Sequence, residues 1–153
     1  MTDQKAKISR AVARLERLLK ETETPAYNAQ KFHSSSDVKT FIKARLFNEE
    51  REIFIALYLT TQHALIECVT ESTGTIDCAS VYPREIVKRA LALNASAVII
   101  AHNHPSGESF PSSADLDITK RIKDALGLLD IRVLDHIIAA KHSVYSFAES
   151  GKI

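Results

Sequence analysis

Residues 96–122 read SAVIIAHNHPSGESFPSSADLDITKRI. The opening segment, SAVIIA, is apolar almost throughout, as is typical of a β-strand covered on both faces. Two of the four prolines of the chain and one of its four glycines lie in residues 102–113, which predicts a loop. Ser112 can begin a helix that we expect to continue to about Leu129. A buried strand that leads through a loop into a helix is typical of an α/β fold.

The segments on either side of this stretch predict a mixed sheet with helices packed against it. Further strands are expected at residues 52–60, 63–71, 131–140 and 143–149, of which the first two form a hairpin that Gly74 ends. Further helices are expected at residues 83–93, beginning at Pro83, and at residues 37–47, capped by Ser35 or Ser36. With one more helix at the N-terminus, the expected order is α-α-β-β-α-β-α-β-β.

The N-terminal part of the chain predicts an amphipathic helix at residues 5–21 and a linker over residues 22–35. Its apolar stripe, within residues 8–19, suits packing on its own domain or on a second subunit in a homo-oligomer. Its basic stripe is interpreted as a solvated face rather than a phosphate-binding one. We therefore divide the chain into an N-terminal helical extension with its linker, residues 1–33, and an α/β domain, residues 34–153.

The composition argues against several classes of partner. Of the 153 residues, 45% are hydrophobic and 25% are charged, the balance of an ordinary globular protein. A net charge of +1 predicts no long-range attraction to nucleic acid or to an anionic membrane. No apolar run approaches the roughly 18 residues that span a bilayer, and the first residues lack the pattern of a secretory signal. Cys68 and Cys78 are interpreted as reduced thiols, so we expect a cytoplasmic protein.

His102 and His104 lie two residues apart, directly after the buried strand. Side chains at positions i and i+2 of an extended segment project to the same side, so the two imidazoles can share one metal ion. Asp115, in the first turn of the next helix, is the natural third ligand. Two histidines and one carboxylate are typical of catalytic zinc, because they leave a fourth position for water. Zinc lowers the pKa of that water to ~7, so the sequence predicts one Zn²⁺ per chain and a hydroxide nucleophile.

Each part of this pattern also has a simpler interpretation. Ser112 and Asp115 form a helix capping box, in which the helix dipole favours an acidic side chain. A lone His-x-His pair is usually solvated or packed. The combination of both within residues 102–115 favours zinc. Asp117 is also acidic, but it lies about 200° around the helix from Asp115, so only one of the two can face the metal.

A hydrolase built on such a site needs a general base. Glu49, Glu50 and Glu52 lie just before or at the start of the first strand. Glu52 is the candidate nearest to the buried run, and surface charge is the alternative interpretation for all three. Asp135 and His136 could orient a zinc ligand, but we interpret them as polar residues at turns of a strand pair and leave them out of the site.

From about residue 34 onward the chain resembles a known family. His102-Asn-His104, seven residues, Ser112, two residues and Asp115 match the JAMM zinc signature of the JAB/MPN metallopeptidases. The surrounding sequence is similar to the RadC-like branch of that superfamily, in the segments REIFIALYL, YPREIVKRALALNASAVIIAHNHPSG, PSSADLDITKRI and IRVLDHII.

The resemblance implies a cytidine-deaminase-like three-layer sandwich, a mixed sheet with flanking helices. It implies that His102, His104 and Asp115 hold the zinc. Glu52 would be the base or proton shuttle, and Ser112 would steady the oxyanion formed at a scissile amide. The implied activity is zinc-dependent hydrolysis of an amide bond in a peptide or protein substrate, whose identity the sequence does not encode.

One departure concerns DNA. Full-length RadC-like proteins resemble, at their N-terminus, a helix-hairpin-helix DNA-binding module, whose hairpin requires glycine. The first glycine here is Gly74, so direct DNA binding is not expected. Two other functions stay open: a catalytically silent MPN domain that serves as an interaction scaffold, and a factor associated with DNA repair. Silent members typically lack ligands, whereas this sequence has every position of the signature, which favours catalysis.

Overall fold

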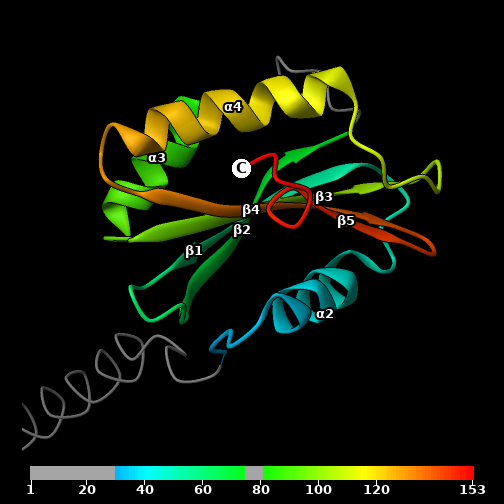
Figure 1. The fold of residues 1–153 in the computed structure, drawn as a ribbon, viewed down its shortest axis with the longest axis horizontal. Helices are drawn as coiled ribbons and strands as arrows, with labels where there is room; N and C mark the ends of the chain where they lie inside the picture. The colour runs from blue at the N-terminus through cyan, green and yellow to red at the C-terminus, as the bar shows by residue number, and fades with distance from the viewer. Residues whose placement is uncertain (1–29, 75–80) are drawn as a thin grey trace, which may run out of the picture.

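A computed structural model describes residues 30–74 and 81–153 (Figure 1). The elements in chain order are α2 (Ser35–Leu46), β1 (Ile53–Leu59), β2 (Leu65–Thr73), α3 (Pro83–Ala92), β3 (Ala97–His104), α4 (Ser113–Gly127), β4 (Arg132–Ala140) and β5 (Val144–Ser146). The helix expected at residues 5–21, and most of the linker after it, lie outside the described residues.

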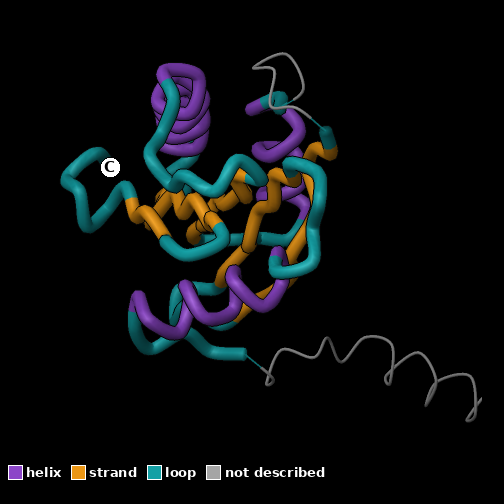
Figure 2. Tube along the Cα trace, turned by 90° about the vertical axis from the view of Figure 1, so that its right-hand side faces the viewer, coloured by secondary structure: helices purple, strands orange, loops and turns teal. Residues whose placement is uncertain are grey.

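The strands form one five-stranded sheet in the order β2-β1-β3-β4-β5, with helices on both faces. α3 and α4 cover one face and α2 covers the other, and Figure 2 shows the same three layers from the side. β1 pairs antiparallel with β2 and with β3, β3 is parallel to β4, and β4 is antiparallel to β5. The expected α/β sandwich, with a mixed sheet and the hairpin of β1 and β2, is therefore confirmed.

Alternating side chains of the central strands build two apolar cores. Phe54 and Tyr58 of β1 pack toward α3 and α4, whereas Ile55 and Leu57 pack toward α2. Every residue of β1 is buried, as expected for a strand covered on both faces. β3 lies between β1 and β4 in the sheet, so its end is supported by a paired strand on either side.

Several boundaries differ from the sequence-based expectation. β3 continues to His104 instead of ending at residue 101, because its last residues still pair with β4. α2 is capped by Ser34, whose hydroxyl accepts from the backbone N–H of Asp37, and not by Ser35 or Ser36. β5 is confined to Val144–Ser146, because the chain after it forms a turn that ends its pairing with β4.

One of the two cysteines, Cys68, lies among the described residues. Cys68 is a free, half-buried thiol on β2, and burial raises its pKa. Cys78 lies outside the described residues.

Among the helices of residues 30–74 and 81–153, none combines the length and the apolar character needed to cross a membrane.

Candidate metal centre

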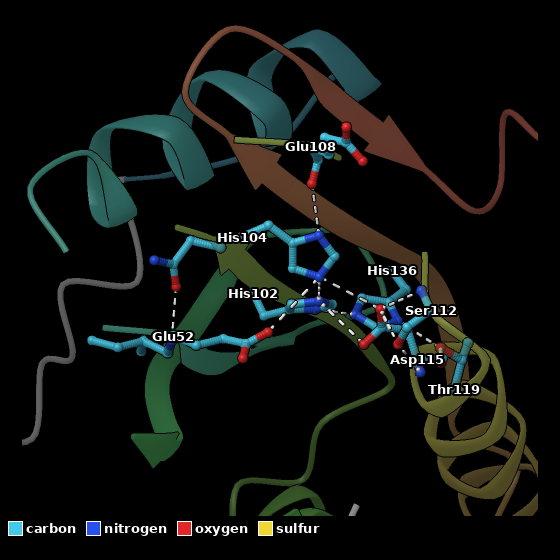
Figure 3. A network of polar contacts seen from close by, with 10 residues as sticks. Glu52, His102, His104, Glu108, Ser112, Asp115, Thr119 and His136 are labelled. Carbon is cyan, nitrogen blue, oxygen red and sulfur yellow. Dashed lines mark hydrogen bonds and ion pairs between the residues drawn. The ribbon is translucent and has the colours of Figure 1, made fainter. Parts of the chain in front are cut away.

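β3 presents two histidines on the face that α4 covers. His102 continues the row of Val98 and Ile100 on that face, and His104 follows it. The side chain of His102 is fully buried, and that of His104 is 15% exposed. Their Nε2 atoms lie 2.9 Å apart (Figure 3). The two imidazoles therefore meet on one side of the strand, as their spacing predicts.

The first turn of α4 brings Asp115 to the same point. Its Oδ1 lies 3.3 Å from Nε2 of His102, and its Oδ2 lies 3.5 Å from Nε2 of His104. The predicted capping box is present: Ser112 donates to Oδ2 from its backbone N–H at 2.7 Å and from its hydroxyl at 2.8 Å. Asp117 is exposed. Capping the helix and facing the histidines are thus compatible roles for Asp115: Oδ2 accepts from Ser112 and also lies near His104, whereas Oδ1 faces His102.

Glu52 approaches the histidines from the neighbouring strand. Because β1 and β3 are antiparallel, the start of β1 lies beside the end of β3. Glu52 Oε1 lies 3.8 Å from Nε2 of His104, and Figure 3 shows the carboxylate pointing toward both imidazoles. Atoms of Glu52, His102 and His104 that can bind a metal ion lie within 4.8 Å of one another. Glu49 forms an ion pair elsewhere and Glu50 is exposed, so Glu52 is the glutamate that the fold places here.

Sequence reasoning misses Asn103, which fixes the segment that carries Glu52. Its side chain is buried and lies on the opposite face of β3 from the two histidines. Its Oδ1 accepts from the backbone N–H of Ile53 at 2.7 Å, and its Nδ2 donates to the carbonyls of Arg51 at 2.8 Å and Glu49 at 3.3 Å. A polar residue inside an apolar strand must find partners, and that was the only signal available in the sequence.

The interpretation of His136 as a polar residue at a turn is wrong. His136 lies within β4 rather than at a turn, and it is fully buried. Its Nε2 lies 2.8 Å from Nδ1 of His102, and its Nδ1 lies 2.5 Å from the hydroxyl oxygen of Thr119. Asp135 does lie outside the site, where it accepts from the hydroxyl of Ser146. Burial lowers the pKa of His136 well below its usual value, and the neighbouring His102 adds to that effect.

The chemistry of these groups fits a divalent cation. The carbonyl oxygen of Glu108 lies 2.8 Å from Nδ1 of His104 and can only accept, so Nδ1 carries the proton and Nε2 presents a lone pair. Ligand atoms around one tetrahedral zinc lie roughly 3.3 Å apart, because each is ~2.0–2.2 Å from the metal. The two Nε2 atoms lie 2.9 Å apart, and the Asp115 carboxylate lies 3.3 Å from one of them through Oδ1 and 3.5 Å from the other through Oδ2, which is close to that spacing.

The electrostatics keep the carboxylate ionised. Burial by itself would raise the pKa of Asp115, but the neighbouring imidazoles of His102 and His104 lower it well below its usual range. The same contact with Asp115 raises the pKa of His104 against the opposing effect of burial. The centre therefore combines a stable negative charge with two nitrogen donors, which is a composition that zinc accepts.

The chain matches the RadC-like JAB domain family over residues 32–152. It belongs to that family. The RadC-like JAB match covers every residue of the centre, so the resemblance seen in the sequence is confirmed. The match begins close to residue 34, where we expect the α/β domain to start, but the division of the chain at that point stays a prediction.

Several curated relatives are similar to this RadC-like JAB chain. It is 54% identical over 120 residues to a UPF0758 protein of Vibrio cholerae serotype O1, a match that covers 78% of this chain and 75% of that protein. It is 57% identical over 114 residues to a UPF0758 protein of Chromohalobacter salexigens, covering 74% and 51%. A UPF0758 protein of Marinobacter nauticus is 44% identical over 146 residues, covering 95% and 65%. The chain thus spans half to three quarters of the length of these relatives, and their shared name states no activity.

Proposed function

We propose that this chain is a zinc-dependent hydrolase that cleaves an amide bond in a peptide or protein substrate. One observation carries the proposal: His102 and His104 converge with the Asp115 carboxylate, while Glu52 faces the same point from the neighbouring strand. Two histidines with a carboxylate suit catalytic zinc, and a second carboxylate beside them suits proton transfer. Membership of the RadC-like JAB family supports this choice of reaction class.

The ion would be held by Nε2 of His102, Nε2 of His104 and Oδ1 of Asp115. Asp115 suits this role better than Glu52, because it is only 2% exposed and contacts both histidines. Its Oδ2 already accepts two hydrogen bonds from Ser112, which leaves Oδ1, 3.3 Å from Nε2 of His102, as the oxygen free to bind the ion. Zinc in this position supplies Lewis acidity, which lowers the pKa of water and polarises a carbonyl group.

Glu52 is the general base in this proposal. Its side chain is 18% exposed, so it can meet both the centre and a substrate that approaches from solvent. It accepts a proton from water at a carboxylate oxygen and returns it to the amide nitrogen as that bond breaks. Asn103 forms hydrogen bonds with the backbone of Arg51 and Ile53, on either side of Glu52, and these limit how far the Glu52 carboxylate moves.

Ser112 has two roles to reconcile. The sequence resemblance implies that its hydroxyl steadies the substrate oxyanion. In this structure the hydroxyl donates to Oδ2 of Asp115 and accepts from the backbone N–H of Asp115. A hydroxyl has a single proton, so a hydrogen bond to substrate requires that proton to leave Asp115. Orientation of Asp115 is therefore the first role we assign to Ser112, and the oxyanion role stays a prediction.

Metal analysis is the first test. We expect about one zinc per chain in the parent, and a strong loss in His104→Ala and in Asp115→Ala. Asp117→Asn, on the exposed side of the same helix turn, is the matched control and should keep its zinc. Full zinc content in the first two variants would overturn the assignment of the ligands.

A peptide-library screen then separates a hydrolase from a silent scaffold. The parent should cleave, Glu52→Gln should lose most of that activity while it retains zinc, and Glu50→Gln should behave as the parent does, because Glu50 is exposed and outside the centre. Equal cleavage by the parent and Glu52→Gln would show that another group is the base. Zinc binding without cleavage of any peptide would favour the scaffold.

A further inference from the structure

We infer that Thr119 and His136 are positioning residues that fix which nitrogen of His102 carries its proton, and so aim the Nε2 lone pair of His102 at the metal position. The inference rests on the proposed function only for the identity of the ion. The hydrogen-bond geometry itself belongs to the described residues of the chain and stands without it.

The four groups form one continuous row behind the centre (Figure 3). The hydroxyl of Thr119 lies 2.5 Å from the backbone carbonyl of Asp115 and 2.5 Å from Nδ1 of His136. Nε2 of His136 lies 2.8 Å from Nδ1 of His102. The row begins at the backbone of one proposed ligand and ends at the ring of another, so it couples Asp115 to His102 through two side chains.

The direction of every hydrogen bond in this row follows from its first member. A carbonyl oxygen only accepts, so the hydroxyl of Thr119 donates its one proton to Asp115. Toward His136 the same oxygen must then accept, which places the proton of His136 on Nδ1. A neutral imidazole carries one N–H, so Nε2 of His136 is an acceptor. His102 therefore donates from Nδ1 and presents its lone pair at Nε2, on the side of His104.

The row lies in the interior of the domain. His136 is fully buried, and Thr119 is 3% exposed, so water does not replace a missing hydrogen bond. The ring of His136 is stacked on Phe147 and meets the ring of Phe54 edge-on, which holds its plane in place. Rotation of this imidazole would leave a buried polar atom without a partner, which is costly in an apolar core.

Metal-binding histidines in general depend on a partner at the second ring nitrogen, and removal of that partner typically weakens metal affinity ~10–100-fold. His104 uses the carbonyl of Glu108 for this purpose. Within residues 30–74 and 81–153, the partner of His102 at Nδ1 is not a carbonyl but the ring of His136. Because a ring can exist as either tautomer whereas a carbonyl cannot, the ring needs Thr119 to set its direction.

The test compares Thr119→Val, which removes the hydroxyl at nearly constant volume, with Thr119→Ser, which keeps it. Ring-nitrogen NMR of the full chain with ¹⁵N-labelled histidine, after metal removal, reports the tautomer of His136. We expect the proton on Nδ1 in the parent and in Thr119→Ser, and a mixture of tautomers in Thr119→Val. Zinc affinity, measured by competition with a chromophoric chelator, should fall ~10–100-fold in Thr119→Val and stay near the parent value in Thr119→Ser.

A second pair of variants guards against simple misfolding. His136→Gln keeps an acceptor for His102 and a donor for Thr119, so it should bind zinc more tightly than His136→Leu, which keeps neither. A His136 proton on Nε2 in the parent, or equal zinc affinities within both pairs, would overturn the inference while leaving the hydrolase proposal intact. A parent that binds no zinc would instead overturn the proposed function, and the tautomer measurement would still decide the positioning role.

Discussion

The Nε2 atoms of His102 and His104 face each other at 2.9 Å at the end of β3. Each ring is held from behind at Nδ1, His104 by the carbonyl of Glu108 and His102 by His136. Two nitrogen lone pairs at this distance repel each other unless a cation or a proton lies between them. The Asp115 carboxylate beside them adds negative charge. Folding therefore assembles groups whose mutual repulsion a metal ion relieves.

Zinc is accordingly expected to stabilise the folded chain. Addition of zinc to protein stripped by a chelator should raise the melting temperature, because the ion binds the native state more tightly than the unfolded chain. At a free zinc concentration roughly 100-fold above Kd, the free energy of unfolding rises by about 2.7 kcal/mol. Differential scanning calorimetry measures the shift. His104→Ala should show a much smaller shift, and magnesium, which prefers oxygen ligands, should have little effect on the parent. An unchanged melting temperature with zinc would contradict this prediction.

Ser112→Ala should lower both stability and zinc affinity. The substitution removes the cap at the start of α4, which costs about 1 kcal/mol of unfolding free energy, and it removes one donor to Oδ2 of Asp115. Ser113→Ala is the matched control, because Ser113 is exposed at the next position. Urea unfolding of the zinc-free proteins measures the first effect, and chelator competition measures the second. If both alanine variants unfold at the same urea concentration, the hydroxyl of Ser112 does not stabilise the helix as we expect.

Local patterns predicted the parts of the centre that lie close together in the sequence. The i, i+2 spacing placed His102 and His104 on one side, and the capping pattern of Ser112 and Asp115 located the first turn of α4. The apolar run SAVIIA predicted the strand buried on both faces that became β3. Each of these features depends on residues only a few positions apart in the sequence. Hydrophobic periodicity predicts secondary structure over that short range.

The parts that sequence reasoning missed depend on long-range register. A register shift between β3 and β4 places Val133 and His136 on the same face of the sheet, although strict alternation would separate them. The partners of Asn103 lie on a strand that is distant in sequence, so nothing local reveals them. Such shifts arise from pairing between strands, which a single sequence does not display.

Asn103→Ala should destabilise the chain and reduce hydrolysis without removing the zinc ligands. The substitution leaves the buried backbone N–H of Ile53 without its partner, at a cost of about 1–3 kcal/mol, and it also removes the partner of the Arg51 carbonyl. Because the same segment carries Glu52, we expect a lower rate of peptide cleavage with zinc content retained. Chemical denaturation, zinc analysis and a cleavage assay test the three parts. Asn48→Ala, at an exposed position before β1, is the control. A parent-like stability of Asn103→Ala would show that the hydrogen bonds of the Asn103 side chain contribute little to the free energy of unfolding.

Asp135 provides a pH-dependent test on the far side of the sheet from the centre. Burial raises its pKa above the ordinary value of 3.8, although hydrogen bonds from Ser146 and Ala148 oppose that shift. Because the folded-state pKa is the higher one, the native state holds this proton more tightly than the unfolded state does. The resulting stability is fully present below the unfolded-state pKa and is lost as the pH rises through the folded-state value.

Asp135→Asn cannot ionise, so it escapes that loss. The melting temperature of Asp135→Asn relative to the parent should therefore increase between about pH 4 and about pH 7. Asp117→Asn, at an exposed position, corrects for the general effect of removing one negative charge. Calorimetry of the parent, Asp135→Asn and Asp117→Asn, all without zinc, measures these melting temperatures across the same pH range. A relative melting temperature that falls with rising pH would mean that the hydrogen bonds from Ser146 and Ala148 stabilise the charged form more than burial destabilises it.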